Sequence, residues 1–222
     1  MKKKSPITRS RYFNDPVFER SRENNTEFTR AAKANRVLRH AFKPGMLNKA
    51  DRYVSGRLTK TMFRILQTDP INERGERRVP QGVLNFLGGF NFNRDTNLQT
   101  ILRAPYSITF NQEAMLATIS IPSFIPRAMI DTESDANAFM LTAMAASLHF
   151  EKESYPVEPV QTDLLDMSLQ QHEDLQLQLP VIGHQPDHSV VVALGIEFFQ
   201  SALGQIKPLD KKHNALAVVK VF

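Results

Sequence analysis

Cysteine is absent from the 222 residues of this chain, and its absence excludes several kinds of chemistry. A chain without thiols has no disulfide, no thiolate nucleophile and no cysteine-ligated zinc or iron–sulfur site. Long apolar runs are lacking as well. Even the longest, such as residues 190–196, have the length of a strand and fall short of the roughly 20 residues that a bilayer-spanning helix needs. We therefore expect a fold held together by packing, with no membrane span.

Several short motifs of catalysis and targeting are also missing. Gly88 and Gly89 are followed by no Lys-Ser or Lys-Thr pair, and neither G-x-G-x-x-G nor G-x-S-x-G occurs. The basic start, MKKKSPITRSRY, continues with polar residues where the apolar core of a secretion signal would follow. We expect no signal peptide, and a protein that is cytoplasmic or carried within a particle assembled in the cytoplasm. The missing motifs favour a non-enzymatic protein without a cofactor.

Charge is divided unevenly along the chain. Residues 1–80 hold 20 of the 28 Lys and Arg and 8 of the 23 Asp and Glu, a balance of +12. Residues 81–222 hold the other 8 basic and 15 acidic residues, a balance of −7. This asymmetry predicts a cationic module joined to a mildly anionic one. The two modules could neutralise each other, but the excess of positive charge favours an anionic partner outside the chain.

Two basic amphipathic helices are predicted within the first 80 residues. The sequence NDP that begins at Asn14 has the form of a helix start, and the sequence KPG that begins at Lys43 has the form of a helix end. Residues 28–43 place apolar side chains on one half of a helical wheel and basic side chains on the other. Residues 49–68 do the same. The two helices could form a hairpin or lie separately over the rest of the protein.

The basic halves of these helices form the predicted partner-binding face. Its residues are Arg30, Lys33, Arg36, Arg39, Lys43, Arg57, Lys60 and Arg64. Acidic partners are scarce, because only Asp51 and Asp69 follow Glu27 before residue 70. Unpaired like charges repel one another unless something external neutralises them. A third basic cluster, at residues 74–78, lies in a turn with glutamates that could pair with it locally.

Two aromatic residues, Tyr53 and Phe63, fall on the basic side of the second helix. Flat rings among Arg and Lys could stack on nucleic-acid bases. A ring off the apolar stripe is more often covered by a neighbouring domain or a protein partner. Both interpretations remain open from the sequence.

The apolar period changes from 3.6 toward 2 after about residue 83, which predicts strands. The predicted strands, of which the first two would form a hairpin, are 106–111, 117–121, 138–150, 164–169, 175–179, 190–198 and 215–222. Segment 138–150 is rich in helix formers, yet it is nearly uncharged, as a strand buried on both faces would be. We interpret it as a strand.

This pattern indicates an α+β, mainly β fold. We expect an antiparallel β-sandwich, Ig-like or jelly-roll-like, with a flattened barrel as the alternative. The expected organisation is a basic helical arm or hairpin at residues 1–80, a connector at 81–97 and the sandwich at 98–222.

One loop has residue types that bind metal ions. His184, Asp187 and His188 could ligate zinc or another divalent ion. The loop contains Gly and Pro, however, and no helix holds the imidazoles at a fixed spacing, so we expect no metal there. His149 and His172 stand alone in the sequence, which is typical of structural histidines.

Two segments resemble the two ends of a family of bacterial proteins of unknown function. They are RSRENNTEFTRAAKANRVLRHAF at residues 20–42 and LGIEFFQSALGQIKPLDKKHNALAVVKVF at residues 194–222, about a quarter of the chain. The resemblance implies that the helix and the terminal strands occur together in the same kind of protein. It implies no activity and no binding residue.

The sequence thus predicts a non-enzymatic adaptor or assembly protein. Its basic arm would dock on an acidic protein surface or take part in a homo-oligomeric assembly, as in a component or cargo of a virion or a contractile injection particle. The first alternative is a nucleic-acid-binding protein that uses the same basic face. The second is a metal-dependent enzyme at the His184/His188 loop.

Overall fold

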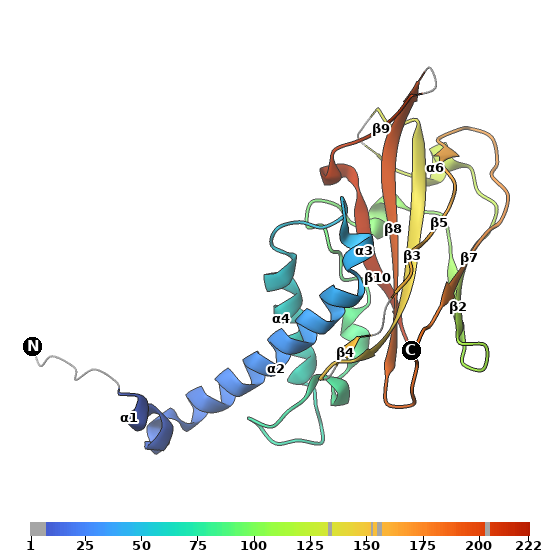
Figure 1. Cartoon of the computed structure of the whole chain (residues 1–222). Helices are drawn as coiled ribbons and strands as arrows, with labels where there is room; N and C mark the ends of the chain where they lie inside the picture. The colour runs from blue at the N-terminus through green and yellow to red at the C-terminus, as the bar shows by residue number, and fades with distance from the viewer. Residues whose placement is uncertain (1–7, 133–134, 152, 155–156, 203–204) are drawn as a thin grey trace, which may run out of the picture.

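The computed structural model describes residues 8–132, 135–151, 153–154, 157–202 and 205–222. Two antiparallel sheets lie against each other, and a layer of helices covers the other face of the larger sheet (Figure 1). Residues 1–7, on which part of the expectation about a signal peptide rests, lie outside the described residues.

The larger sheet has the strand order β10-β8-β3-β4, with β5 and β6 paired to β3 and β9 paired to β8. Its strands are β3 (Ala138–His149), β4 (Glu153–Ser154), β5 (Val160–Gln161), β6 (Leu165–Asp166), β8 (Ser189–Ala202), β9 (Gln205–Pro208) and β10 (Ala215–Val221). The smaller sheet has the order β1-β2-β7. Its strands are β1 (Ser107–Asn111), β2 (Leu116–Ile121) and β7 (Leu175–Pro180).

The helices are mostly in the first half of the chain. They are α1 (Arg9–Asn14), η1 (Pro16–Phe18), α2 (Glu19–Ala41), α3 (Lys43–Met46), α4 (Val54–Leu66), η2 (Val79–Gln81), η3 (Leu84–Leu87), α5 (Leu98–Ile101), α6 (Pro126–Met129) and η4 (Lys211–His213). No helix within the described ranges is long and apolar enough to cross a membrane.

Strands β3 and β8 form the centre of the molecule. They pair in antiparallel register from Ala138↔Phe199 to Leu148↔Ser189. Alternate side chains point to opposite faces of a strand, so Leu141 and Leu194 enter the core between the sheets, while Met144 and Val191 enter the core beneath the helices. Burial on both faces explains the nearly uncharged sequence of β3. The prediction of a strand here is confirmed, as are the antiparallel α+β architecture and the β1–β2 hairpin.

The helices do not form an arm with a core of its own. Leu38 of α2 and Leu58 and Ile65 of α4 share one core with the larger sheet, and Leu87 and Phe92 from the expected connector join it. The expected boundaries at residues 80 and 97 therefore do not separate two independent hydrophobic cores. Among the described helices, α1, η1 and the first turns of α2 project from the body (Figure 1).

Helix α4 begins five residues later than the periodicity predicts. Asn48 has a positive φ of 60°, which is incompatible with a right-handed helix. The turn directs Lys49 inward, where its Nζ lies 2.7 Å from Oε2 of Glu197 on β8. Asn48 also donates a hydrogen bond to Glu197, at 3.3 Å. This buried ion pair attaches the link between the helices to the sheet.

The Lys49–Glu197 pair provides a test of this attachment. We expect Glu197→Ala to lower the free energy of unfolding by about 3 to 5 kcal/mol, because it leaves the Lys49 ammonium buried without a counter-charge. The double variant Lys49→Met/Glu197→Leu removes both charges and should recover most of that loss. Urea denaturation of the three proteins measures the differences. Equal losses in the single and double variants would contradict the expectation.

Candidate partner-binding surface

Helices α2 and α4 lie side by side and antiparallel over the sheet. Phe28 near the start of α2 packs against Phe63 near the end of α4, with ring centroids 6.2 Å apart. Further along α2, the buried Asn35 donates to the hydroxyl oxygen of Thr59 at 2.7 Å and to the carbonyl oxygen of Ser55 at 3.0 Å. The apolar stripes face the sheet, so the opposite faces of both helices are left to solvent.

The solvent faces of the two helices carry a set of basic residues, here called the outer basic face. Its members are Arg36, Arg39, Lys43, Lys60 and Arg64. Within each helix they recur every three or four residues, the spacing that places side chains on one side. All are exposed except Arg39, which is half-buried because its Nε donates to Oδ1 of Asn35 at 3.0 Å. Within the described part of the chain, none of the five forms an ion pair.

Two of the predicted face residues instead contact this chain's own carboxylates. Arg30 donates to Oε2 of Glu76 and to the carbonyl oxygen of Gly75, both at 2.6 Å. Arg57 forms an ion pair with Asp51 and donates to the carbonyl oxygen of Phe92 at 2.9 Å. Their guanidinium groups hold loops to the helices, and we therefore exclude both residues from the outer basic face.

Lys33 is exposed but lies on a different flank. It lines a cavity of about 370 Å³ together with Arg30, Arg78 and Glu151. Arg78 donates to Oε2 of Glu151 at 3.2 Å. This flank therefore has mixed charge, unlike the outer basic face.

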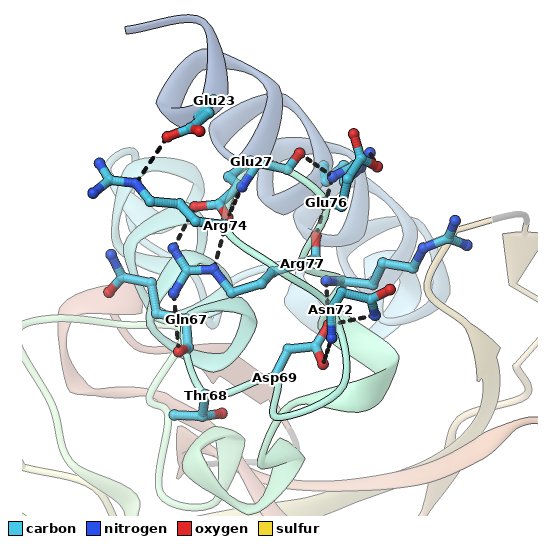
Figure 2. A network of polar contacts seen from close by, with 12 residues as sticks. Glu23, Glu27, Gln67, Thr68, Asp69, Asn72, Arg74, Glu76 and Arg77 are labelled. Atoms are coloured by element: carbon cyan, nitrogen blue, oxygen red, sulfur yellow. Dashed lines mark hydrogen bonds and ion pairs between the residues drawn. The ribbon is translucent and has the colours of Figure 1, made fainter. Parts of the chain in front are cut away.

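Two arginines of the loop at residues 74–78 pair with carboxylates of α2, as Figure 2 shows. Arg77 binds the buried carboxylate of Glu27 through two hydrogen bonds, at 2.7 and 2.8 Å. The backbone N–H of Gly75 donates to the same carboxylate at 2.8 Å, and Arg74 lies 3.3 Å from Glu23. The prediction that these arginines pair with glutamates of the same turn is wrong: the partners of Arg74 and Arg77 lie on α2, about fifty residues earlier, and Arg78 pairs with Glu151.

Glu27 remains ionised because its hydrogen bonds outweigh the cost of burial. Burial alone raises the pKa of this carboxyl, but the hydrogen bonds from Arg77 and Gly75 and the charge of Arg77 lower it further, and the net pKa lies below its usual value. The pKa of Asp51 is lowered in the same way, because bonds from Arg57 and the backbone of Tyr53 outweigh burial. Both acids are thus committed to internal cations.

The two aromatic rings of the predicted stacking pair already have partners. The ring of Tyr53 lies between the guanidinium groups of Arg52 and Arg94, whose Cζ atoms are 4.6 and 5.4 Å from its centroid. Phe63 packs on Phe28. Phe63 is half-buried, and Tyr53 is 47% exposed but already contacts two guanidinium groups.

The histidine loop meets β3 at one end of the sheet. Ser147 Oγ lies 2.9 Å from Nδ1 of His188 and 3.3 Å from Nδ1 of His184. Asp187 lies 3.7 Å from Nε2 of His188 and 3.6 Å from Nε2 of His149. Among the residues that the structure describes, no group of three or more His, Asp or Glu is arranged to hold a metal ion.

Sequence reasoning treated His149 as isolated and missed its place in this cluster. The register of β3 and β8 pairs Leu148 with Ser189, which places His149 beside His188. The serine in the cluster is buried and already hydrogen-bonded. Neither a metal-dependent site nor an exposed nucleophile is supported by this geometry.

The buried Glu27–Arg77 pair predicts a pH-dependent stability. The pKa of Glu27 is lowered in the folded protein, so its stabilising contribution is fully present above its unfolded pKa and is lost as the pH falls through the folded value. We expect Glu27→Gln to lower the free energy of unfolding by about 2 kcal/mol at neutral pH. The difference from the unmodified protein should shrink below about pH 4.

Urea denaturation between neutral and acidic pH measures this difference. Glu76→Gln is the matched control, because Glu76 pairs with Arg30 at the surface and its loss should cost less than about 1 kcal/mol. A Glu27→Gln deficit that is unchanged at acidic pH would contradict the assignment.

No model of a known protein family matches this chain, and no curated protein shows significant similarity to it. Its function therefore has to be inferred from its own residues.

Proposed function

We propose that the protein is a non-catalytic binding protein whose outer basic face docks on an acidic protein surface. The observation that carries the proposal is the group of exposed cations on α2, α3 and α4 that have no ion-pair partner in the described part of the chain. No acidic residue occurs between Glu27 and Asp51 or between Asp51 and Asp69. Flexibility of these side chains therefore cannot bring a neighbouring carboxylate of the same helices to them.

A protein partner is favoured over single-stranded nucleic acid by the state of the aromatic rings. Sequence-independent binding of single strands relies on aromatic side chains on which bases stack, and Tyr53 and Phe63 are engaged within the chain. The outer basic face is also built on two antiparallel helices that pack on the sheet, which sets the backbone positions of its cations. A pattern of charges gives specificity and fast association with a complementary protein surface.

Charge reversal on this face tests the proposal. We expect Arg36→Glu/Lys60→Glu/Arg64→Glu to weaken binding to the native partner by at least about 100-fold, because attraction becomes repulsion at three positions. The matched control is Lys207→Glu/Lys211→Glu/Lys212→Glu, which makes the same change in net charge with exposed residues elsewhere. Control binding should change by less than about threefold.

The measurement uses the full chain, since the helices share a core with the sheet. Proteins retained by the unmodified protein and the control but lost from the outer-face variant are identified, purified and titrated at several salt concentrations. A 20-base-pair DNA duplex, chosen as about two helical turns, is titrated in parallel. Equal losses in both variants would overturn the docking surface. Outer-face-dependent DNA binding with a steep salt slope would replace the protein partner by nucleic acid.

A further inference from the structure

Helix α1 and the turn η1 form an ordered extension that adds nothing to either core. Neither element has a buried residue, and both project from the body at the outer end of α2 (Figure 1). Phe13 is 55% exposed and Val17 is 79% exposed. An isolated helix of six residues is unstable in water, so contacts other than burial must hold α1 in place.

Polar contacts with α2 define the conformation of the extension. Arg22 donates to the carbonyl oxygens of Tyr12 at 2.7 Å and Asp15 at 3.0 Å, and Asn25 donates to the Tyr12 hydroxyl at 2.6 Å. Asp15 also accepts from the backbone N–H of Val17 at 3.1 Å. These bonds fold α1 back on α2 and leave its apolar side chains facing solvent. We call Arg9, Arg11, Phe13 and Val17 the arm tip.

The arm tip combines apolar and cationic groups. Its two arginines are exposed. The guanidinium of Arg9 lies over the ring of Phe13, with Cζ 5.9 Å from the centroid, and Nε of Arg11 lies 3.3 Å from Oδ2 of Asp15. Residues 1–22 contain seven Lys and Arg and two acidic residues. A partner for the tip must therefore offer apolar contact together with negative charge.

Residues 153–206 include no Lys or Arg and eight acidic residues, of which Glu197 is buried against Lys49 and Asp187 lies beside the histidines. Within this segment, Glu173 and Asp174 line a cavity of about 480 Å³ with Ser123, Gln171 and His172. It is a shallow depression that is widely open to solvent. We call it the acidic cavity.

Exposed apolar side chains adjoin the acidic cavity. Leu169 is 78% exposed and lies two residues before a lining residue, and Ile125 is 38% exposed beside the Phe124–His172 bridge. The cavity region thus has both features that the arm tip requires. Its segment adjoins α6, which lies at the opposite end of the molecule from α1 (Figure 1). The arm cannot fill the cavity of its own chain.

We propose that the arm tip of one copy docks in the acidic cavity of a second copy. Phe13 and Val17 would contact Leu169 and Ile125 of the second copy. Arg9 would face Glu173, because Arg11 already pairs with Asp15 and Asp174 already accepts from the backbone N–H of Ser123. Each copy has one arm and one cavity, so the contact is head-to-tail and repeats, generating a ring or a filament. This interface uses residues distinct from the outer basic face.

Sedimentation velocity of the full chain over about 5 to 200 µM tests the interface. We expect concentration-dependent assembly that weakens at high salt, because the contact includes exposed charges. Phe13→Ser/Val17→Ser and Glu173→Lys/Asp174→Lys should each sediment as monomers throughout this range. Neither variant changes a buried side chain, so folding should be retained, and circular dichroism checks it.

Mixing the two variants gives the sharpest result. Phe13→Ser/Val17→Ser keeps an intact cavity, and Glu173→Lys/Asp174→Lys keeps an intact arm. An equimolar mixture of the two should therefore form dimers and no larger assembly. Ile71→Ser, at an apolar side chain that is 75% exposed elsewhere, is the matched control and should assemble like the unmodified protein. Arg36→Glu/Lys60→Glu should also assemble, which separates this interface from the proposed docking face.

Three outcomes would overturn the proposal. They are a monomer at every concentration, assembly that survives in either variant, and a mixture that does not dimerise. Vesicles of anionic phospholipid provide a last comparison: a monomeric protein that binds them through the arm residues would assign the tip to a lipid surface instead.

Discussion

The pairing of β3 with β8 is the constraint on which the rest of this structure depends. Their side chains are apolar on both faces, so each face of the larger sheet has to be covered. The small sheet of β1, β2 and β7 covers one face, and α2 and α4 cover the other. The helices are thus a structural layer as well as a basic module, and only their outer surface remains for a partner.

The packing of the helices also determines which of their charged residues have an ion-pair partner within the chain. Arg30 and Arg57 lie where loops cross the helices, within reach of Glu76 and Asp51, and they hold those loops in place. The cations of the outer basic face have no acidic neighbour in the sequence, and Arg64 packs on the ring of Phe86 from η3. Positive charge is therefore retained there, while the flanks are neutral or mixed. The net charge of the first 80 residues overstates what is available for binding.

Two surfaces of different character result from this arrangement. The outer basic face lies on the parts of α2 and α4 that pack on the sheet. The arm tip lies beyond the sheet and is held by hydrogen bonds to α2, so its apolar groups remain exposed. The docking and self-assembly proposals rest on these two separate surfaces.

The local patterns predicted the elements well where one physical signal dominated. Alternation identified the β1–β2 hairpin and β10, the lack of charge identified β3, and the helical wheel identified the basic residues of α2 and α4. Each of these signals arises because one or both faces of the element are buried. The signal is the same whichever element packs on that face, so it can be read from the sequence alone. Strands of two residues, such as β5, left no pattern and were missed.

What the sequence determined by itself is the identity of the elements, the antiparallel class and the uneven distribution of charge. Only the tertiary structure decided which charges remain unpaired and that the helices share a core with the sheet. It also brought His149 to His188 and Lys49 to Glu197. The physical reason is that ion pairs and histidine clusters form between residues up to 148 positions apart along the chain. Such contacts depend on strand register and loop paths, which periodicity does not encode.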